Sequence, residues 1–450
     1  NAFPKLKTDM IRQLFEEEGL PNTFADNHSL CDDISNKLKE VKILDPACGS
    51  GAFPMGILNR MVELLEKLDS KNKETHYDLK LHLIEECIYG VDIQTIAAQI
   101  SKLRFFISLT VEQDKDENKE NYGITPLPNL ETKFVAANAL ISIGYENRSL
   151  LDLNNTKLIE MKNQLWEIRK QHFYAKKATD KKKLRERDEK QREKIKNYIA
   201  ENTAKPNQEL IIQYNGELKK LEAERKNYEG ENWVETTGRA TQTDIFGNHA
   251  KKGKSLFSID KNRRERERID KSIKAVRAKI EQEYNKTERI GAEAEVEKLA
   301  KWNPYDQNES SLFFDMEWMF GIKDGFDIVI GNPPYISTKG VDAKTKKDLE
   351  KAYGFADDTY NHFFFKGIEL MEENGVLSYI TPKTFWTTQT KRNLRDLLLS
   401  KRICYIFDTA NPFEAAMVDT CIISVINAVA KYNIIQFLDG SKDLLNPLKY

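Results

Sequence analysis

Hydrophobic positions along the chain alternate between short β-branched or aromatic runs and longer stretches with helical spacing. Seven runs have the length and composition of buried strands: residues 41–46, 87–93, 133–140, 326–334, 375–382, 402–409 and 421–428. Amphipathic segments such as 53–68 and 95–109 lie between successive runs. This alternation predicts an α/β fold with a seven-stranded, mostly parallel, doubly wound sheet.

The alternation is interrupted by a helical, highly charged insertion at residues 151–310. Apolar side chains recur there at helical spacing, at Leu158, Met161, Leu165 and Ile168 and again at Ile269, Ile273, Val276 and Ile280. Residues 161–230 and 261–300 together carry a net charge of about +10, against about −11 for the rest of the chain. Two interpretations are open: a solvated helical hairpin packed along one seam, which we favour, or a basic arm that contacts nucleic-acid phosphates.

Composition narrows the class of protein. The chain has 450 residues, of which 40% are hydrophobic, enough to build real cores. No run approaches the roughly 20 apolar residues of a membrane span, and no secretory pattern opens the chain, so we expect a cytoplasmic protein. The five cysteines are scattered without a CxxC pair, which predicts reduced core thiols and no metal site.

Glycine and acidic residues follow the first two predicted strands. Open α/β sheets bind ligands where their strands end. The segment DPACGSGAF (45–53) places Asp45 at a strand end and two glycines in a tight turn before a helix, whose first N–H groups can bind a carboxylate. The segment YGVDI places Asp92 at the next strand end, where its carboxylate can accept ribose hydroxyl protons while Ile93 packs on an adenine.

Together with NPPY at 332–335, these segments resemble the motifs of the S-adenosylmethionine-dependent amino-methyltransferases that act on DNA adenine, in particular those of type IIG restriction-modification enzymes. The resemblance covers residues 41–140 and 311–430 and implies a sheet of the S-adenosylmethionine methyltransferase type, with that compound as cofactor. The implied cofactor-binding residues are Asp45, Pro46, Ala47, Cys48, Gly49, Gly51, Phe53, Asp92, Ile93, Asn138 and Ala139.

The chain departs from this family at the end of the third predicted strand. The family usually has an acidic residue followed by an aromatic there, whereas this chain has Asn138, Ala139 and Leu140. Asn138 can still hydrogen-bond the adenine of the cofactor, but aromatic stacking is lost. The Tyr-Thr-Pro segment common before the first strand is also absent.

The NPPY corner suits a specific chemical problem. The amino group of adenine is a poor nucleophile because its lone pair is delocalised into the ring. The Asn332 side-chain carbonyl and the Pro333 backbone carbonyl can accept its protons, and Pro333 and Pro334 keep these carbonyls aimed. Asn332, Pro333, Pro334 and Tyr335 are therefore the predicted catalytic residues, for a direct attack of nitrogen on the methyl group.

A base inside a duplex cannot reach this corner and must be extruded. By resemblance, Tyr335 stacks on one face of the extruded base and Phe413, in ANPFEAAMVDTCII, on the other. The expected partner is double-stranded DNA.

The expected organisation has five parts. They are a helical lead-in (1–40), the cofactor-binding half (41–150), the insertion (151–310), the catalytic half (311–430) and the start of a truncated C-terminal target-recognition region (431–450). Because the chain begins with Asn1, we expect a fragment, and a nuclease module, if one exists, would lie upstream.

The sequence thus predicts a site-specific DNA adenine-N6 methyltransferase of a restriction-modification or phage-defence system. Two alternatives stay open. The same corner could methylate a glutamine of a protein or an adenine of RNA, or the chain could be a non-catalytic scaffold.

Overall fold

The computed structural model describes residues 8–16, 19–25, 27–68, 74–143, 156–202, 208–227, 266–280, 297–410, 418–430 and 435–439. The chain forms two compact units. One comprises Asn1–Ile143, Ile159–Glu193 and Leu299–Tyr450, and the other Gly144–Leu158 and Lys194–Lys298. No helix in the described ranges is long and apolar enough to cross a membrane.

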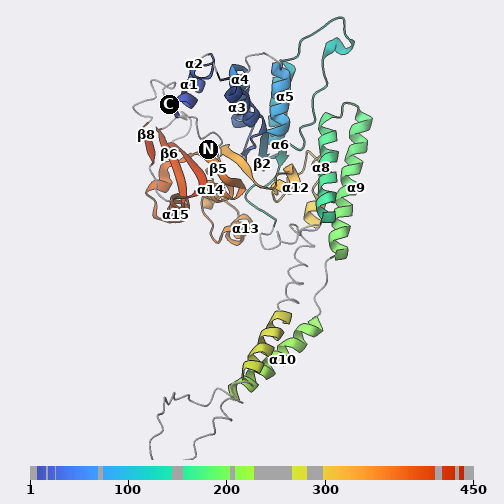
Figure 1. Ribbon diagram of the computed structural model, residues 1–450, viewed down its shortest axis with the longest axis vertical. Helices are drawn as coiled ribbons and strands as arrows, with labels where there is room; N and C mark the ends of the chain where they lie inside the picture. The colour runs from blue at the N-terminus through green and yellow to red at the C-terminus, as the bar shows by residue number, and fades with distance from the viewer. Residues whose placement is uncertain are drawn as a thin grey trace, which may run out of the picture. The chain divides into compact units, whose positions relative to one another are not determined.

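A sheet of eight strands, counted over the described residues, forms the centre of the first unit (Figure 1). The strands are β1 (Ile43–Asp45), β2 (Ile88–Asp92), β3 (Phe134–Ala136), β4 (Phe326–Gly331), β5 (Met371–Pro382), β6 (Lys401–Ala410), β7 (Thr420–Val429) and β8 (Gln436–Asp439). Their spatial order is β3-β2-β1-β4-β5-β7-β6-β8. Strand β7 runs antiparallel to β5 and β6, and all other neighbours are parallel.

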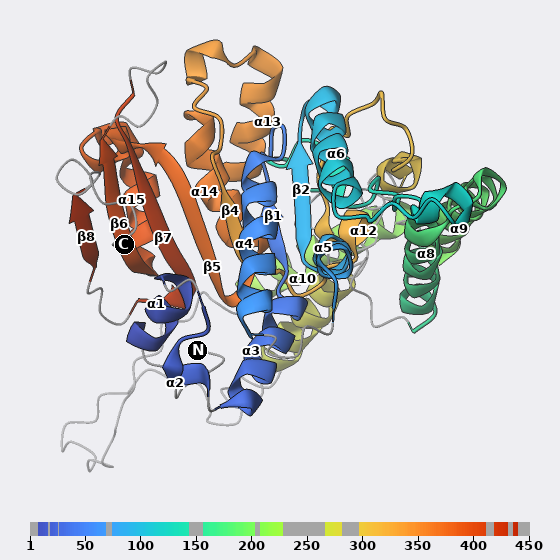
Figure 2. The same ribbon diagram turned by 90° about the horizontal axis from the view of Figure 1, so that it is seen from above.

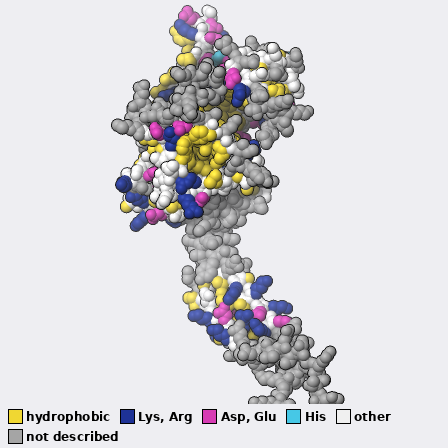
Figure 3. All heavy atoms as spheres, turned by 90° about the vertical axis from the view of Figure 1, so that its left-hand side faces the viewer, with side chains coloured by type: hydrophobic (Ala, Val, Ile, Leu, Met, Phe, Trp, Pro, Cys, Tyr) yellow, Lys and Arg dark blue, Asp and Glu magenta, His cyan; other side chains and the backbone are white. Residues whose placement is uncertain are grey.

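The seven predicted runs form β1 to β7, so the predicted α/β fold with a mostly parallel sheet is confirmed. Strand β8 was not predicted, because its apolar run is short and interrupted by Gln436. It extends the sheet beside β6, with Tyr405 opposite Gln436. Figure 3 views the molecule from the side of this edge and shows hydrophobic side chains gathered among charged ones; Phe437 of β8 is 58% exposed.

Three helices cover one face of the cofactor half of the sheet: α4 (Ala52–Leu68), α5 (His76–Glu86) and α6 (Thr95–Thr110). Figure 2 shows them beside β1 and β2. Their apolar stripes, including Leu58 and Phe105, bury Ile43 and Ile88 in one core. The predicted helices 53–68 and 95–109 are therefore confirmed as α4 and α6.

Because side chains alternate along a strand, Tyr89 points to the opposite face of the sheet. There its ring meets those of Phe320 and Phe326 at centroid distances of 5.1 and 5.6 Å. The other elements outside the insertion are η1 (Glu120–Gly123), α12 (Met316–Phe320), η3 (Thr338–Gly340), α13 (Ala343–Tyr353), α14 (Thr359–Leu370), η4 (Lys383–Trp386), η5 (Gln389–Lys391) and α15 (Arg392–Ser400). Helices therefore cover the sheet on both sides, as a doubly wound fold requires.

The N-terminal helices form a smaller core of their own. These are α1 (Thr8–Glu16), α2 (Asn22–Ala25) and α3 (His28–Glu40). Phe24, Cys31 and Ile34 pack there with Leu64 and Leu68 on the outer side of α4. All five cysteines of the chain are free and four are buried, as expected for core thiols.

The helices α8 (Thr156–Tyr174) and α9 (Ala178–Asn202) lie side by side in Figure 1 and are joined by buried charges. Asp188 is 0% exposed, and its two carboxylate oxygens accept hydrogen bonds from Arg169 Nε at 2.8 Å and Arg192 Nε at 2.7 Å. Arg169 also donates to the Trp318 carbonyl at 2.5 Å, and Arg192 donates to that of Ala300. The seam of this hairpin is therefore partly ionic, which apolar periodicity could not reveal.

The second unit contains α10 (Gln208–Asn227) and the helical residues 266–280. Of the predicted stripe, Ile269, Ile273 and Val276 are buried and Ile280 is half-buried; Ile211 of α10 is buried as well. Ion pairs join the two helices, from Arg225 to Asp270 at 2.7 Å and from Arg277 to Glu222 at 3.0 Å.

The buried network makes a prediction about stability. Replacing Asp188 with alanine leaves two buried guanidinium groups without their carboxylate, which should lower the free energy of unfolding by about 3–5 kcal/mol. Urea unfolding followed by circular dichroism measures the change. The control is Glu189→Ala on the exposed side of the same helix, expected to stay within about 0.5 kcal/mol of the parent. Equal losses of unfolding free energy in the two variants would contradict the proposed contribution of the buried network to stability.

Candidate active site

The loop after β1 brings its backbone close to neighbouring groups. Gly49 and Gly51 have φ of 54° and 78°, in the left-handed region that glycine enters freely. A Cβ atom on Gly51 would lie 2.9 Å from the Ser101 hydroxyl oxygen. The Cys48 backbone N–H donates to the Val91 carbonyl at 2.9 Å, which ties the loop to β2. Glycines at these two positions therefore fit the tight turn predicted from the sequence.

Asp92, at the end of β2, links the two cofactor motifs. One carboxylate oxygen accepts a hydrogen bond from the Gly49 backbone N–H at 2.9 Å, and the other accepts from the Gln94 N–H at 2.8 Å. Each carboxylate oxygen has a further lone pair for a ligand hydroxyl. Next to Asp92, the Ile93 side chain is 58% exposed, and Phe53 at the start of α4 is 39% exposed. The site thus offers acceptors beside uncovered apolar surface.

The loop after β3 is the third part of this edge. The Ala137 N–H donates to the Asp92 carbonyl at 2.8 Å, so the loop lies against the end of β2. The Asn138 side-chain oxygen accepts from the Leu140 N–H at 3.1 Å, which leaves its amide NH₂ group for other partners. Ala139 is buried. Tyr353 donates to the Leu140 carbonyl at 2.6 Å.

The NPPY corner follows β4 directly. The Tyr335 hydroxyl lies 2.5 Å from Asn332 Oδ1 and 3.1 Å from the Ile380 carbonyl oxygen. Burial raises the pKa of Tyr335 above its ordinary value, so the hydroxyl keeps its proton and can donate. The Asn332 carbonyl oxygen is thereby held in a fixed orientation.

A residue that the sequence did not single out holds the other side of this corner. The Thr359 hydroxyl donates to the Pro334 carbonyl and accepts from the Ile336 N–H at 3.0 Å. The Thr359 N–H in turn donates to the Ile336 carbonyl at 2.9 Å. In the sequence Thr359 is one hydroxyl residue in the apolar helical segment DTYNHFFFKGIELM (358–371), and no local pattern marks it.

The glycine loop after β1 and the NPPY corner meet at Asp45 and Gly331. Asp45 is 2% exposed, and a Cβ atom on Gly331 would lie 2.6 Å from its Oδ1 atom. Burial raises the pKa of Asp45 to about 7, the Asp92 carboxylate adds to the rise, and a hydrogen bond from the Ala47 N–H opposes it. Asn332 directly follows Gly331 in the chain. It therefore lies close to the carboxyl group of Asp45, the first residue of the DPACGSGAF segment.

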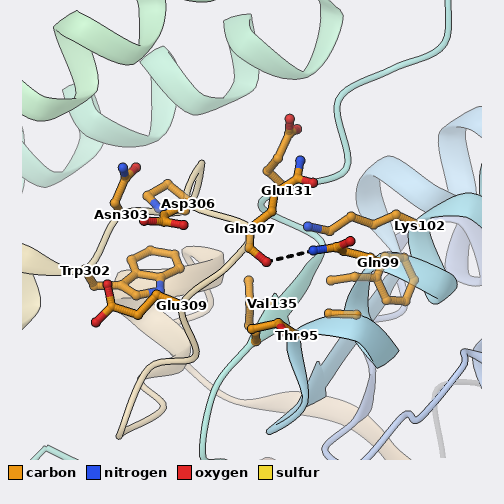
Figure 4. A pocket seen from close by; sticks show the side chains of 14 residues that line it. Thr95, Gln99, Lys102, Glu131, Val135, Trp302, Asn303, Asp306, Gln307 and Glu309 are labelled. Atoms are coloured by element: carbon orange, nitrogen blue, oxygen red, sulfur yellow. Dashed lines mark hydrogen bonds between the residues drawn. The ribbon is translucent and has the colours of Figure 1, made fainter.

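Of the predicted site residues, Phe413 lies outside the described residues. The others belong to the loops at the ends of β1, β2, β3 and β4, at the carboxyl edge of the sheet. A separate cavity of about 20 Å³ lies between α6 and residues 302–309 (Figure 4). Gln99 spans it with a hydrogen bond to the Gln307 carbonyl at 2.8 Å. It has room for a water molecule and contains none of the predicted site residues.

Sequence comparison decides the family. A profile of the Eco57I restriction-modification methylase family matches residues 86–414, and a profile of the MmeI DNA-methyltransferase domain matches residues 22–148. The chain belongs to the Eco57I restriction-modification methylase family. The resemblance to restriction-modification methyltransferases inferred from the three motifs is therefore confirmed.

Individual relatives agree with this family. A candidate type II restriction enzyme and methyltransferase of Methanocaldococcus jannaschii is 27% identical over 413 residues, which cover 89% of this chain and 31% of that protein. The adenine-specific methyltransferase PglX of Streptomyces coelicolor is 33% identical over 70 residues, covering 16% of this chain and 6% of that protein. The chain thus spans less than a third of either relative.

A solved structure was also compared. The type IIL restriction-modification enzyme MmeI in complex with DNA matches 95% of this chain and 37% of that chain, with 12% identity and a TM-score of 0.38. The family assignment rests on the sequence profiles.

The buried Asp45 carboxyl makes stability depend on pH. Between its ordinary pKa of 3.8 and the native value of about 7, the folded protein holds a proton that the unfolded chain releases, so stability falls as pH rises through this range. Asp45→Asn removes this dependence. The difference in free energy of unfolding between the variant and the parent should therefore increase with pH in favour of the variant. The increase between pH 3.8 and pH 7 should reach about 4 kcal/mol. Denaturant unfolding without ligand checks this, and a pH-independent difference would contradict it.

Proposed function

We propose that this chain transfers a methyl group from S-adenosylmethionine to the exocyclic amino group of adenine in double-stranded DNA, within a restriction-modification system. The observation that carries the proposal is the packing of Gly331 on Asp45, which puts the NPPY corner beside the glycine loop. Two half-sites from distant parts of the sequence thereby face one reaction centre.

The residues at the edge of the sheet fit the cofactor. Asp92 would hold the ribose through its remaining lone pairs, and Ile93 and Phe53 would cover apolar parts of the ligand, which accounts for their exposure of 58% and 39%. The Asn138 amide would donate to the adenine ring. Bound S-adenosylmethionine supplies a methyl group activated by a positively charged sulfur.

Asn332 and Pro333 act on the other reactant. The Asn332 side-chain carbonyl and the Pro333 backbone carbonyl would accept hydrogen bonds from the two N–H groups of the amino group, which draws its nitrogen toward tetrahedral geometry and frees the lone pair for attack. Neither group is a strong base, so the extra proton leaves for solvent after the transfer. Tyr335 fixes the amide from one side, and the second lone pair of Asn332 Oδ1 remains for adenine.

The target base must leave the duplex to reach this corner. We propose that the Tyr335 ring stacks on one face of the extruded adenine and Phe413 on the other. We propose that the specific sequence is read by a region after β8, since residues 436–439 belong to the sheet and not to a separate domain beginning near residue 431. Support for adenine as the substrate comes from the NPPY corner and from the name of the adenine-specific relative PglX.

Asn332→Ala tests the reaction directly. The variant loses one pre-aimed acceptor but keeps the glycine loop, so turnover should fall about 10²–10³-fold while calorimetric affinity for S-adenosylmethionine stays at the parent value. Transfer of a labelled methyl group to duplex DNA, followed by nucleoside analysis, measures the rate and the modified base. A variant as fast as the parent would refute the acceptor role. If the parent does not methylate DNA but methylates a glutamine peptide, the role of the NPPY corner would stand and the proposed substrate would be wrong.

Thr359 is a positioning residue for the same step. Thr359→Val keeps the shape but removes the hydroxyl that holds Pro334 and Ile336, so the carbonyls should shift and the turnover number should fall about tenfold to hundredfold. Thr359→Ser keeps the hydroxyl and should recover most of the rate. Cofactor affinity should not change in either variant. Equal rates for the valine and serine variants would remove Thr359 from the mechanism.

A further inference from the structure

We propose that one face of α13 binds the sugar-phosphate backbone of DNA next to the extruded base, through Lys344, Lys347 and Lys351. The inference rests on the proposed action on DNA and names the surface that receives the duplex. No motif of the family identified above includes these lysines.

Helix α13 stands at the edge of the sheet where the reaction is proposed. It follows the NPPY corner after η3, and its last residue, Tyr353, is hydrogen-bonded to the Leu140 carbonyl in the loop after β3. The chain then returns to Thr359, which is bonded to Pro334 and Ile336. Figure 2 shows α13 beside α14. Both ends of the segment are thus tied to the carboxyl edge of the sheet.

The helix buries one side and presents lysines on the other. Leu349 is 1% exposed and anchors α13. At 100° per residue, Lys344, Lys347 and Lys351 fall within one narrow stripe on the opposite side, and all three are exposed. The stripe is about 10 Å long, which is about the axial rise of three nucleotides in B-DNA.

The charges of this stripe are unpaired within the part of the chain that the structure describes. None of the three ammonium groups has an ion pair or side-chain hydrogen bond there, although Asp348 lies four residues after Lys344. Lys347 and Lys351 are like charges at i and i+4, a spacing that destabilises an isolated helix. Elsewhere, lysines at such spacings have acidic partners, as in Lys37–Glu40 and Lys67–Glu63. A polyanion would relieve the repulsion on α13.

The alternative occupant of a lysine stripe is an acidic protein surface. Two features favour DNA. The stripe lies on the helix that follows the corner proposed to receive the extruded base, and the last residue of that helix, Tyr353, is bonded to the loop after β3 at the same edge of the sheet. A duplex whose base enters the corner would bring its phosphates to this edge. An acidic protein is therefore an outcome of the test and not part of the proposal.

The experiment measures binding of a short fluorescent DNA duplex to the full chain by anisotropy, over about 50–200 mM salt. The variant with all three lysines replaced by glutamine should bind at least about tenfold more weakly, and the slope of log affinity against log salt should fall by about 2 to 3. Replacing the same lysines with arginine should restore both. The circular dichroism spectrum and the affinity for S-adenosylmethionine should match the parent in both variants.

The matched control removes three exposed lysines from the opposite edge of the sheet. Lys323 precedes β4, and Lys176 and Lys177 follow Ala175, whose carbonyl is bonded to Asn129 ahead of β3. Lys176 and Lys177 belong to the insertion, for which we favour a solvated hairpin, so replacement of the three lysines by glutamine should leave the salt slope unchanged. If both triple variants lowered DNA affinity and the salt slope equally, net charge alone would explain the result and the proposal would be overturned. An unchanged salt slope in the α13 variant would also overturn it.

The outcomes also separate this inference from the proposed function. A parent that binds duplex DNA with the expected salt dependence but methylates no adenine would uphold the α13 surface and refute adenine methylation. If the parent methylates adenine but the α13 variant retains full DNA affinity, adenine methylation would be upheld and the α13 surface refuted. A parent that binds no DNA overturns both.

Discussion

The candidate site depends on the parallel pairing of β1 with β4. Ile43 lies opposite Ile328 and Leu44 opposite Val329, so the two strands end level, with Asp45 beside Gly331. A slip of one residue would turn every side chain of β4 to the other face of the sheet and carry Asn332 away from the cofactor loop. A Cβ atom at position 331 would lie 2.6 Å from Asp45 Oδ1, so any larger residue there would displace the carboxyl group.

Around this contact, hydrogen bonds fix the orientation of two carbonyl groups and one backbone N–H. Tyr335 holds the Asn332 amide, Thr359 holds the Pro334 carbonyl, and Asp92 holds the Gly49 N–H. Prolines and glycines set the backbone between them. The groups proposed to act on substrate are thus weak acceptors, and their contribution comes from orientation fixed before substrate arrives.

The sequence predicted seven strands and the loops that carry the site because buried strands, strand-end acids and NPPY are local patterns. It missed β8 because the run is short and interrupted by Gln436, so that only its pairing with β6 identifies it as a strand. It missed Thr359 because a hydroxyl in a helical segment becomes informative only when Pro334 is beside it. The buried Asp188 looked like any charge on a solvated helix, because burial of an ion depends on its tertiary partners.

The order of the strands has a consequence for biosynthesis. β4 inserts beside β1 only after about 280 further residues have been made, which at 5–20 residues per second takes on the order of 15 to 60 s. During this interval β1 is an open sheet edge, and unpaired edges invite association with other chains. The core that α4, α5 and α6 form over β1, β2 and β3 is drawn mostly from residues already synthesised. The half of the sheet that contains β1 to β3 can therefore collapse early, while the proposed reaction centre forms only when β4 emerges.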